Sequence, residues 1–220
     1  MSNFAYLQSA SKSGNSALAF PSANVAGNMI VVAVSNINVT AINDTQGNSY
    51  NLVASGGSGT SAQIRIWIAL NINAGANSVT ATGLNASGAH SSIAIIEYTT
   101  TSSVASAGSA VAGSGGTNGT NSRYQSSGEV LFIIATYDFA SSHSWTGTNL
   151  TVRETVAEGG GQTLGIGDFY SATSTTPTVS TLNGGGTNSF TGSLINFIAG
   201  GGGSSTSNIQ ISLSDPLVVN

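Results

Sequence analysis

Short apolar segments alternate with polar turn residues along almost the whole chain. The apolar segments are rich in β-branched side chains and are bounded by Gly, Asn or Ser, a pattern typical of β-strands separated by turns. This pattern predicts about a dozen strands, at Phe4–Ser9, Ala17–Phe20, Asn28–Ser35, Tyr50–Ala54, Gln63–Ile72, Ser78–Leu84, Ser91–Thr99, Glu129–Asp138, Asn149–Glu154, Leu164–Ser171, Thr178–Leu182 and Ser189–Ala199.

No stretch of the sequence combines the 3.6-residue apolar period of a helix with helix caps. We therefore expect an all-β protein with almost no helix. Residues 1–199 are predicted to form one antiparallel β-sandwich domain, jelly-roll-like in architecture. No internal repeat of fixed period is visible in the sequence, and this disfavours solenoids and propellers.

Two of the predicted strands are apolar on both faces, although a strand of a sandwich normally needs only one apolar face. They are Met29–Val34 and Val130–Ala135. One explanation is that long loops or extra strands of the same chain cover the outer face. The other is that a neighbouring subunit covers it, and the sequence leaves both open.

The C-terminal region has its own pattern. Residues 200–207 are Gly and Ser with one Thr, the composition of a flexible linker. Residues 208–220 then resume a strand-like alternation and are predicted to be an arm that takes part in assembly. This arm docks on a sheet edge of its own subunit or of a neighbour, or it completes its own domain as a strand. Its apolar residues are Ile209, Ile211, Leu213, Leu217 and Val218.

The amino-acid composition excludes several classes of function. Of the 220 residues only 5% are charged, with four Lys and Arg against eight Asp and Glu, while 40% are hydrophobic. Four cationic side chains are too few for a nucleic-acid-binding face, and the hydrophobic content excludes disorder. The absence of cysteine excludes disulfides and thiolate chemistry.

The sequence contains no catalytic motif, and the protein is predicted not to be an enzyme. His90 and His143 are far apart in the sequence, and neither has a carboxylate at the spacing of a catalytic motif. The acidic pair Glu154 and Glu158 flanks a glycine loop and is the closest approach to a hydrolase carboxylate pair. Glu97 lies inside an apolar strand and needs a buried partner, for which Arg65 is the expected candidate.

Two further features of the sequence are candidates for ligand binding. Residues 43–50 contain oxygen atoms of the kind that coordinate calcium. A tight turn with Asp44 as an Asx cap and Gly47 at positive φ explains this segment better. Trp145, placed in a polar loop by the pattern, is the best candidate for a sugar-binding platform. The protein is predicted to need no metal and no cofactor.

Several segments together resemble a family of bacterial and phage β-sandwich modules of the concanavalin or laminin-G type. The resemblance covers residues 24 to about 138 and implies a jelly-roll fold in surface or virion structural proteins, with no fixed catalytic residues. It rests on Ala26-Gly27-Asn28 before a strand, Asn43 to Tyr50, Ile66-Trp67-Ile68-Ala69, Ala74 to Thr80, and Glu97-Tyr98.

The first seven residues show no basic and apolar signal pattern, and no apolar run approaches the length of a membrane span. Together with the uncharged polar composition, these features predict a phage virion structural protein made in the host cytoplasm, such as a decoration, fibre or appendage subunit. Its expected partners are other virion proteins and copies of itself, with no nucleic acid and no membrane. The alternative is a secreted extracellular bacterial module that binds a glycan.

Overall fold

The computed structural model of the protein describes residues 4–14, 17–36, 38–56, 64–84, 91–100, 104–108, 112–115, 130–138, 143–147, 150–158, 163–171, 179–183 and 188–197. These residues form strands β1 to β16 and contain no helix. Every strand pairing among them is antiparallel. The prediction of an all-β, antiparallel fold is confirmed, and the sheets are arranged consistently with the predicted sandwich.

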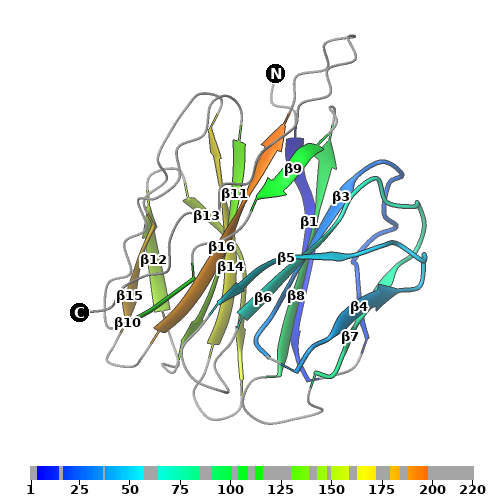
Figure 1. The fold of residues 1–220 in the computed structure, drawn as a ribbon. Coiled ribbons are helices and arrows are strands. Elements are labelled where there is room, and N and C mark those ends of the chain that lie inside the picture. The colour runs from blue at the N-terminus through cyan, green and yellow to red at the C-terminus, as the bar shows by residue number, and fades with distance from the viewer. Residues whose placement is uncertain are drawn as a thin grey trace.

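The first half of the chain forms a five-stranded main sheet and a three-stranded small sheet (Figure 1). The main sheet has the order β1-β8-β3-β6-β5 and the small sheet the order β2-β7-β4. The first and eighth strands are therefore neighbours, an order of the jelly-roll kind. The strands span Phe4–Ser13 (β1), Leu18–Ala19 (β2), Met29–Val34 (β3), Ala41–Asp44 (β4), Asn51–Gly56 (β5), Ile64–Ala69 (β6), Ser78–Thr82 (β7) and Ser92–Thr100 (β8).

The second half forms another main sheet, in the order β10-β16-β11-β14-β13, and a small two-stranded sheet of β12 and β15. Strand β9 pairs with β16 next to β10, along the residues of β16 that β10 leaves free. The strands span Val104–Gly108 (β9), Ala112–Gly115 (β10), Val130–Asp138 (β11), His143–Gly147 (β12), Leu150–Ala157 (β13), Thr163–Ser171 (β14), Val179–Asn183 (β15) and Asn188–Phe197 (β16).

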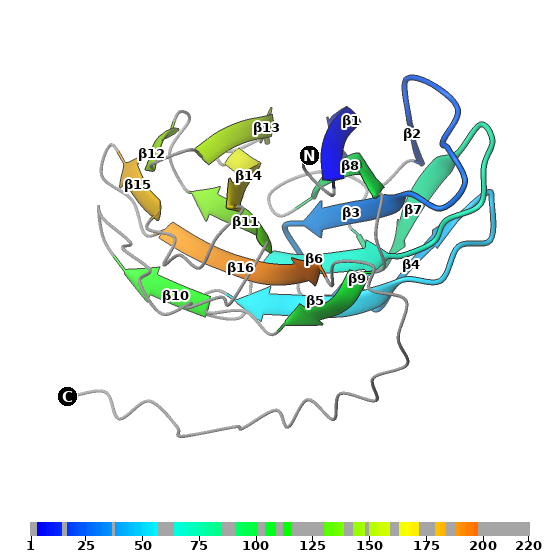
Figure 2. The same ribbon diagram turned by 90° about the horizontal axis from the view of Figure 1, so that it is seen from above.

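The two main sheets face each other, and the two small sheets lie at opposite outer sides (Figure 2). Strand β13 lies against β1 at one edge of the pair, and β10 lies against β5 at the other. Side chains of both main sheets share one buried cluster, which contains Met29, Val31, Ala33, Ala54, Ile64, Ile66, Ile68, Ala94, Ile96, Tyr98, Leu164 and Ile166. Burial of such apolar side chains is the main favourable term that holds the sheets together.

Strand β3 is apolar on both faces because it is covered on both sides by its own chain. Met29, Val31 and Ala33 face the cluster between the main sheets. The alternate residues face a second cluster that contains Ile42 of β4 and Val79 of β7, so the small sheet covers them. For this strand the first explanation is confirmed: the outer face is covered by strands of the same chain and not by a neighbouring subunit. The side chains of β11 lie outside the described part.

Four edge strands of the main sheets contain a β-bulge, in which one extra residue interrupts the pairing. The extra residue is Leu7 in β1, Val53 in β5, Ala105 in β9 and Arg153 in β13, since the register shifts around each of them. A bulge turns the chain locally, and in β13 it places Arg153 over the ring of Tyr6 and Glu154 beside Ser9 and Ser11, all three in β1 of the first main sheet.

All twelve predicted strands are present, with small differences in their bounds, but four short ones were not predicted. Strands β9 and β10 consist mainly of Ala, Gly and Ser, while β4 and β12 contain one large apolar residue each, Ile42 and Trp145, so none of the four shows an apolar alternation. Residues 113–115, the start of a stretch rich in Gly, Ser and Asn, are part of strand β10. The predicted linker 200–207 and arm 208–220 lie outside the described residues.

Candidate functional site

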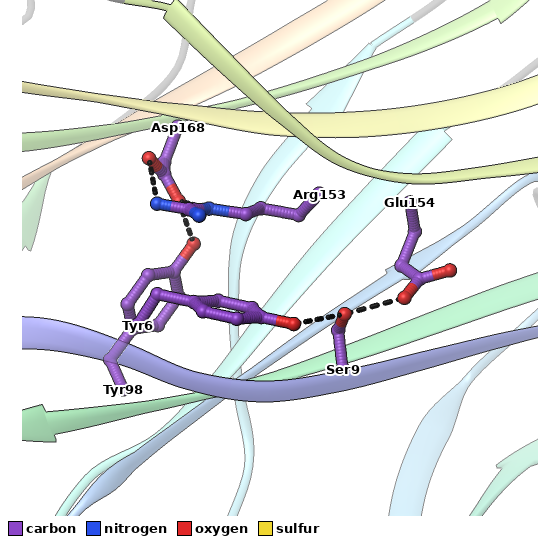
Figure 3. Close-up of polar contacts among 6 residues, drawn as sticks. All are labelled: Tyr6, Ser9, Tyr98, Arg153, Glu154 and Asp168. Atoms are coloured by element: carbon purple, nitrogen blue, oxygen red, sulfur yellow. Dashed lines mark hydrogen bonds and ion pairs between the residues drawn. The ribbon is translucent and has the colours of Figure 1, made fainter.

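Charged side chains gather where β1 and β8 of the first main sheet meet β13 and β14 of the second (Figure 3). The guanidinium of Arg153 donates two hydrogen bonds to Asp168, from Nε to Oδ2 at 2.5 Å and from Nη2 to Oδ1 at 3.0 Å. The side chain of Asp168 is only 4% exposed, against 21% for Arg153. This two-point contact is the strongest form of Arg–carboxylate pairing.

Two tyrosines of the first sheet complete the environment of this ion pair. The phenol of Tyr98 donates to Asp168 Oδ2 at 2.6 Å. The guanidinium of Arg153 lies 4.3 Å from the centre of the Tyr6 ring, in the stacked position of a cation–π contact. The rings of Tyr6 and Tyr98 meet edge to face, with centres 6.4 Å apart. An acid and a base of one sheet are thus enclosed by aromatic groups of the other.

A line of serines extends the contact along β1. Ser9 and Ser11 donate to the two carboxylate oxygens of Glu154, at 2.5 and 2.7 Å. Because the single hydroxyl proton of Ser9 is used in this way, the 2.9 Å contact between Tyr6 and Ser9 has the tyrosine as donor. We name this group the junction cluster, and it consists of Tyr6, Ser9, Ser11, Tyr98, Arg153, Glu154 and Asp168.

The environment of the cluster shifts the pKa of two of its groups. Burial raises the pKa of Tyr98 well above its usual value, and the charge and hydrogen bond of Asp168 raise it further, while Arg153 opposes them. Burial alone would lower the pKa of Arg153, but the hydrogen bond and charge of Asp168 outweigh it, so the net shift is upward. Both groups therefore keep their protons and remain hydrogen-bond donors.

The junction cluster uses its chemical groups to join the two main sheets. The carboxylates of Glu154 and Glu158, which were considered as a hydrolase pair, accept from different serines, since Glu158 takes a 2.6 Å bond from Ser35. The three carboxylates whose side chains are described, those of Glu154, Glu158 and Asp168, therefore each meet a hydroxyl donor of the first half of the chain. The arrangement is that of a polar clamp between sheets.

Glu97 is fully buried, and its partners differ from the predicted Arg65. Both oxygens of its carboxylate accept from neutral donors, which are Gln8, Asn24, the backbone N–H of Val25, and Asn28, at 2.6 to 2.9 Å. Arg65 donates instead to the carbonyl of Val39. The expectation of an Arg65–Glu97 ion pair is therefore wrong. Glu97 fixes the loop after β2 onto the main sheet, because three of its four donors lie in that loop or next to it.

The segment around Asp44 forms the predicted turn. Asp44 Oδ1 accepts from the backbone N–H groups of Gln46 and Asn48, and Gly47 has a φ of 69°. Its other oxygen accepts from Asn48, Tyr50 and Asn77. Burial alone would raise the pKa of Asp44, but these hydrogen bonds outweigh it and lower the pKa. Burial, and then the bond to Asp44, raises the pKa of Tyr50.

Among the described residues that the sequence offered as candidates, Glu154 is the one that belongs to the junction cluster. Trp145 lies in strand β12 and pairs with Thr181, so the prediction of a loop position is wrong, and its side chain lies outside the described part. His143 begins the same strand, and His90 lies outside the described residues. The same holds for the arm residues Ile209, Ile211, Leu213, Leu217 and Val218.

The described residues contain neither a metal-binding cluster nor a helix that could span a membrane. No group of three or more His, Cys, Asp and Glu side chains is placed to hold a metal ion within this part of the chain. No helix in the same residues is long and apolar enough to cross a membrane.

Comparison of the chain with known protein families, with curated proteins and with solved structures finds no match. The resemblance to concanavalin- or laminin-G-type modules stays a prediction.

Proposed function

We propose that the protein is a non-enzymatic structural subunit of a phage virion, in a decoration, fibre or appendage, which acts through self-assembly or by binding the capsid or tail. The observation that carries this proposal is the junction cluster. Its ion pair lies in the second main sheet, and tyrosines and serines of the first main sheet bind the charged groups across the contact, so that the charges strengthen the framework of the protein.

The composition supports the same function. With 5% of its residues charged, the chain places Arg153, Glu154 and Asp168 together at the contact between its sheets. A surface rich in uncharged polar residues is suited to many repeated, close contacts, because it carries little like-charge repulsion between copies. A subunit that is packed many times over in a particle benefits from both properties.

The first experiment measures the mass of the full chain in solution over a range of concentrations. We expect a defined oligomer or a larger assembly, visible also by electron microscopy. Deletion of residues 204–220 should lower the oligomeric state if the arm joins subunits. The variant I209S/I211S/L213S keeps the chain length and should have the same effect as the deletion, because it removes only apolar contacts. A monomer at every concentration contradicts self-assembly.

The alternative, a glycan-binding module, predicts a different result. Such a protein would remain monomeric and would bind an oligosaccharide on a glycan array, and the substitution W145A would abolish the binding. Trp67 is buried under the small sheet and serves as an internal reference for tryptophan fluorescence.

A further inference from the structure

The two halves of the chain contain the same arrangement of strands. We define unit 1 as residues 4–100 and unit 2 as residues 104–197. In unit 1 the main sheet has the order β1-β8-β3-β6-β5, and in unit 2 it has the order β10-β16-β11-β14-β13. The strands correspond one to one, with β9 and β10 together in the place of β1. Each strand of unit 2 begins about 100 residues after its counterpart.

The small sheets agree with this correspondence. Strand β4 pairs with β7 in unit 1, and their counterparts β12 and β15 pair in unit 2. Both small sheets lie on the outer side of their main sheet (Figure 1). The sequence alone shows no repeat of fixed period, so the shared strand order is where the relationship becomes visible.

The pairing register of the strands is also the same in the two units, including the position of a β-bulge. In unit 1 the bulge of β5 lies between Leu52, opposite Trp67, and Ala54, opposite Ile66. In unit 2 the bulge of β13 lies between Val152, opposite Gly167, and Glu154, opposite Ile166. When the two bulges are superposed, the residues that pair with one another across four neighbouring strands also align. In unit 1 this row is Ile96-Val31-Ile68-Asn51, and in unit 2 it is Ser193-Ile133-Asp168-Thr151.

The contacts between the units are reciprocal. Strand β1 packs against β13, the counterpart of β5, while β5 packs against β10, in the place of β1. In the same way β8 packs against β14 and β6 packs against β16 (Figure 2). Reciprocal contacts of this kind are the property of an interface with two-fold symmetry. The units are thus packed like the two subunits of a symmetric dimer.

The symmetry is broken at the junction cluster. Alignment of the rows places Asp168 where unit 1 has Ile68, and Arg153 where unit 1 has Val53, the extra residue of its bulge. It also places Glu154 where unit 1 has Ala54. It places Tyr98 of unit 1 where unit 2 has Ile195. One side of the interface therefore holds an ion pair with a tyrosine, and the positions related by symmetry hold apolar residues.

We propose that the chain is a fused dimer of two copies of one structural unit, and that the contacts of Tyr98 with Asp168 and Arg153 make unit 1 pair with unit 2 rather than with a copy of itself. In a pair of two units 2, the position opposite Asp168 would hold Ile195, and a buried carboxylate would lose its tyrosine donor. In a pair of two units 1, the hydroxyl of Tyr98 would lose its acceptor. Either loss disfavours like pairs.

The first test cuts the folded full chain at one point. A protease site is placed between Thr100 and Val104, the folded protein is cleaved, and native mass spectrometry identifies the complexes. We expect complexes of one unit 1 fragment with one unit 2 fragment, and no like pairs. Separation of the two fragments at micromolar concentration would overturn the proposed pairing surface.

The second test makes the two interfaces alike. The variant Y98I/R153V/E154A/D168I gives each unit the residues of the other at the four asymmetric positions. After cleavage we expect like pairs to form a substantial fraction of all complexes, in contrast to their absence in the parent. Persistence of unlike pairs alone would overturn the specificity.

A control and a second variant keep the result interpretable if the quadruple variant folds poorly. The variant Y50F removes a phenol hydroxyl that donates to Asp44 within unit 1, next to the second buried cluster and away from the contact between the units, and it should behave as the parent does. The single substitution Y98F removes only the hydroxyl and should allow unit 1 like pairs alone to appear. Their absence in a folded Y98F protein counts against the proposal.

Discussion

The hydroxyl of Tyr98 in β8 donates a 2.6 Å hydrogen bond to Asp168 in β14, and this bond joins the two main sheets through the strands that neighbour their edge strands β1 and β13. Asp168 is also held by Arg153. Loss of either donor leaves the carboxylate with one partner, but the cost differs because only Arg153 compensates the charge.

The first prediction compares Y98F with R153M. We expect Y98F to lower the free energy of unfolding by about 1.5–3 kcal/mol, the range for a hydrogen bond to a charged group. R153M should cost more, about 3–5 kcal/mol, because it leaves a buried charge without a counter-ion. Urea denaturation measures both. A smaller effect of R153M than of Y98F would contradict this ranking.

The second prediction concerns Glu97. Its carboxylate accepts four hydrogen bonds, one of them from the backbone of Val25, which cannot turn round to accept. The substitution E97Q introduces a donor among donors and should cost about 1–3 kcal/mol.

The matched control for Glu97 is E154Q. Glu154 accepts from the hydroxyls of Ser9 and Ser11, which can rotate and accept from an amide. E154Q should therefore be clearly milder than E97Q in the same urea experiment, and equal losses would argue against this account of Glu97.

The third prediction is a pH dependence. Hydrogen bonds hold the pKa of Asp44 below its unfolded value, although burial opposes them. The stabilisation from Asp44 is therefore complete above about pH 4 and is lost as the pH falls below that value. The difference in unfolding free energy between the parent and D44N should shrink between pH 6 and pH 2. A difference that stays constant over this range would show that Asp44 does not titrate as expected.

The fourth prediction compares two glycines that both have positive φ. At Gly47, with a φ of 69°, a Cβ would meet nothing within 4 Å, so G47A should cost only the backbone strain of about 1–2 kcal/mol. At Gly83, with a φ of 91°, a Cβ would lie 2.2 Å from the carbonyl oxygen of Asn38. G83A should therefore lower the melting temperature clearly more than G47A, and a reversed order would contradict the packing of this turn.

The strands could be predicted from the sequence wherever they were apolar, and the turn at Asp44 could be predicted because its chemistry is local. Three residues that donate hydrogen bonds to the Asp44 carboxylate lie within six positions of it in the sequence, namely Gln46, Asn48 and Tyr50. Strands such as β10 were missed because Ala, Gly and Ser carry no apolar periodicity, and their pairing comes from the neighbouring strand β16.

The junction cluster was missed because its members are brought together from β1, β8, β13 and β14. One signal was available in the sequence. The alternation in Leu164-Gly165-Ile166-Gly167-Asp168 places Asp168 on the same face as two buried apolar residues, and a buried carboxylate requires a donor. Its partner could not be inferred, because the bulge at Arg153 changes the face to which that side chain points.

The bulges in β1, β5 and β13 have a consequence for solubility. An exposed sheet edge offers free backbone groups to any passing strand, and proteins often prevent this with charged side chains. With so few charges, this chain relies instead on local distortion: Leu7, Leu52 and Val152 lie at the bulges and are exposed by 41–43%. A flat edge with the same apolar residues would favour cross-β aggregation. The bulges therefore protect the protein against aggregation through its sheet edges.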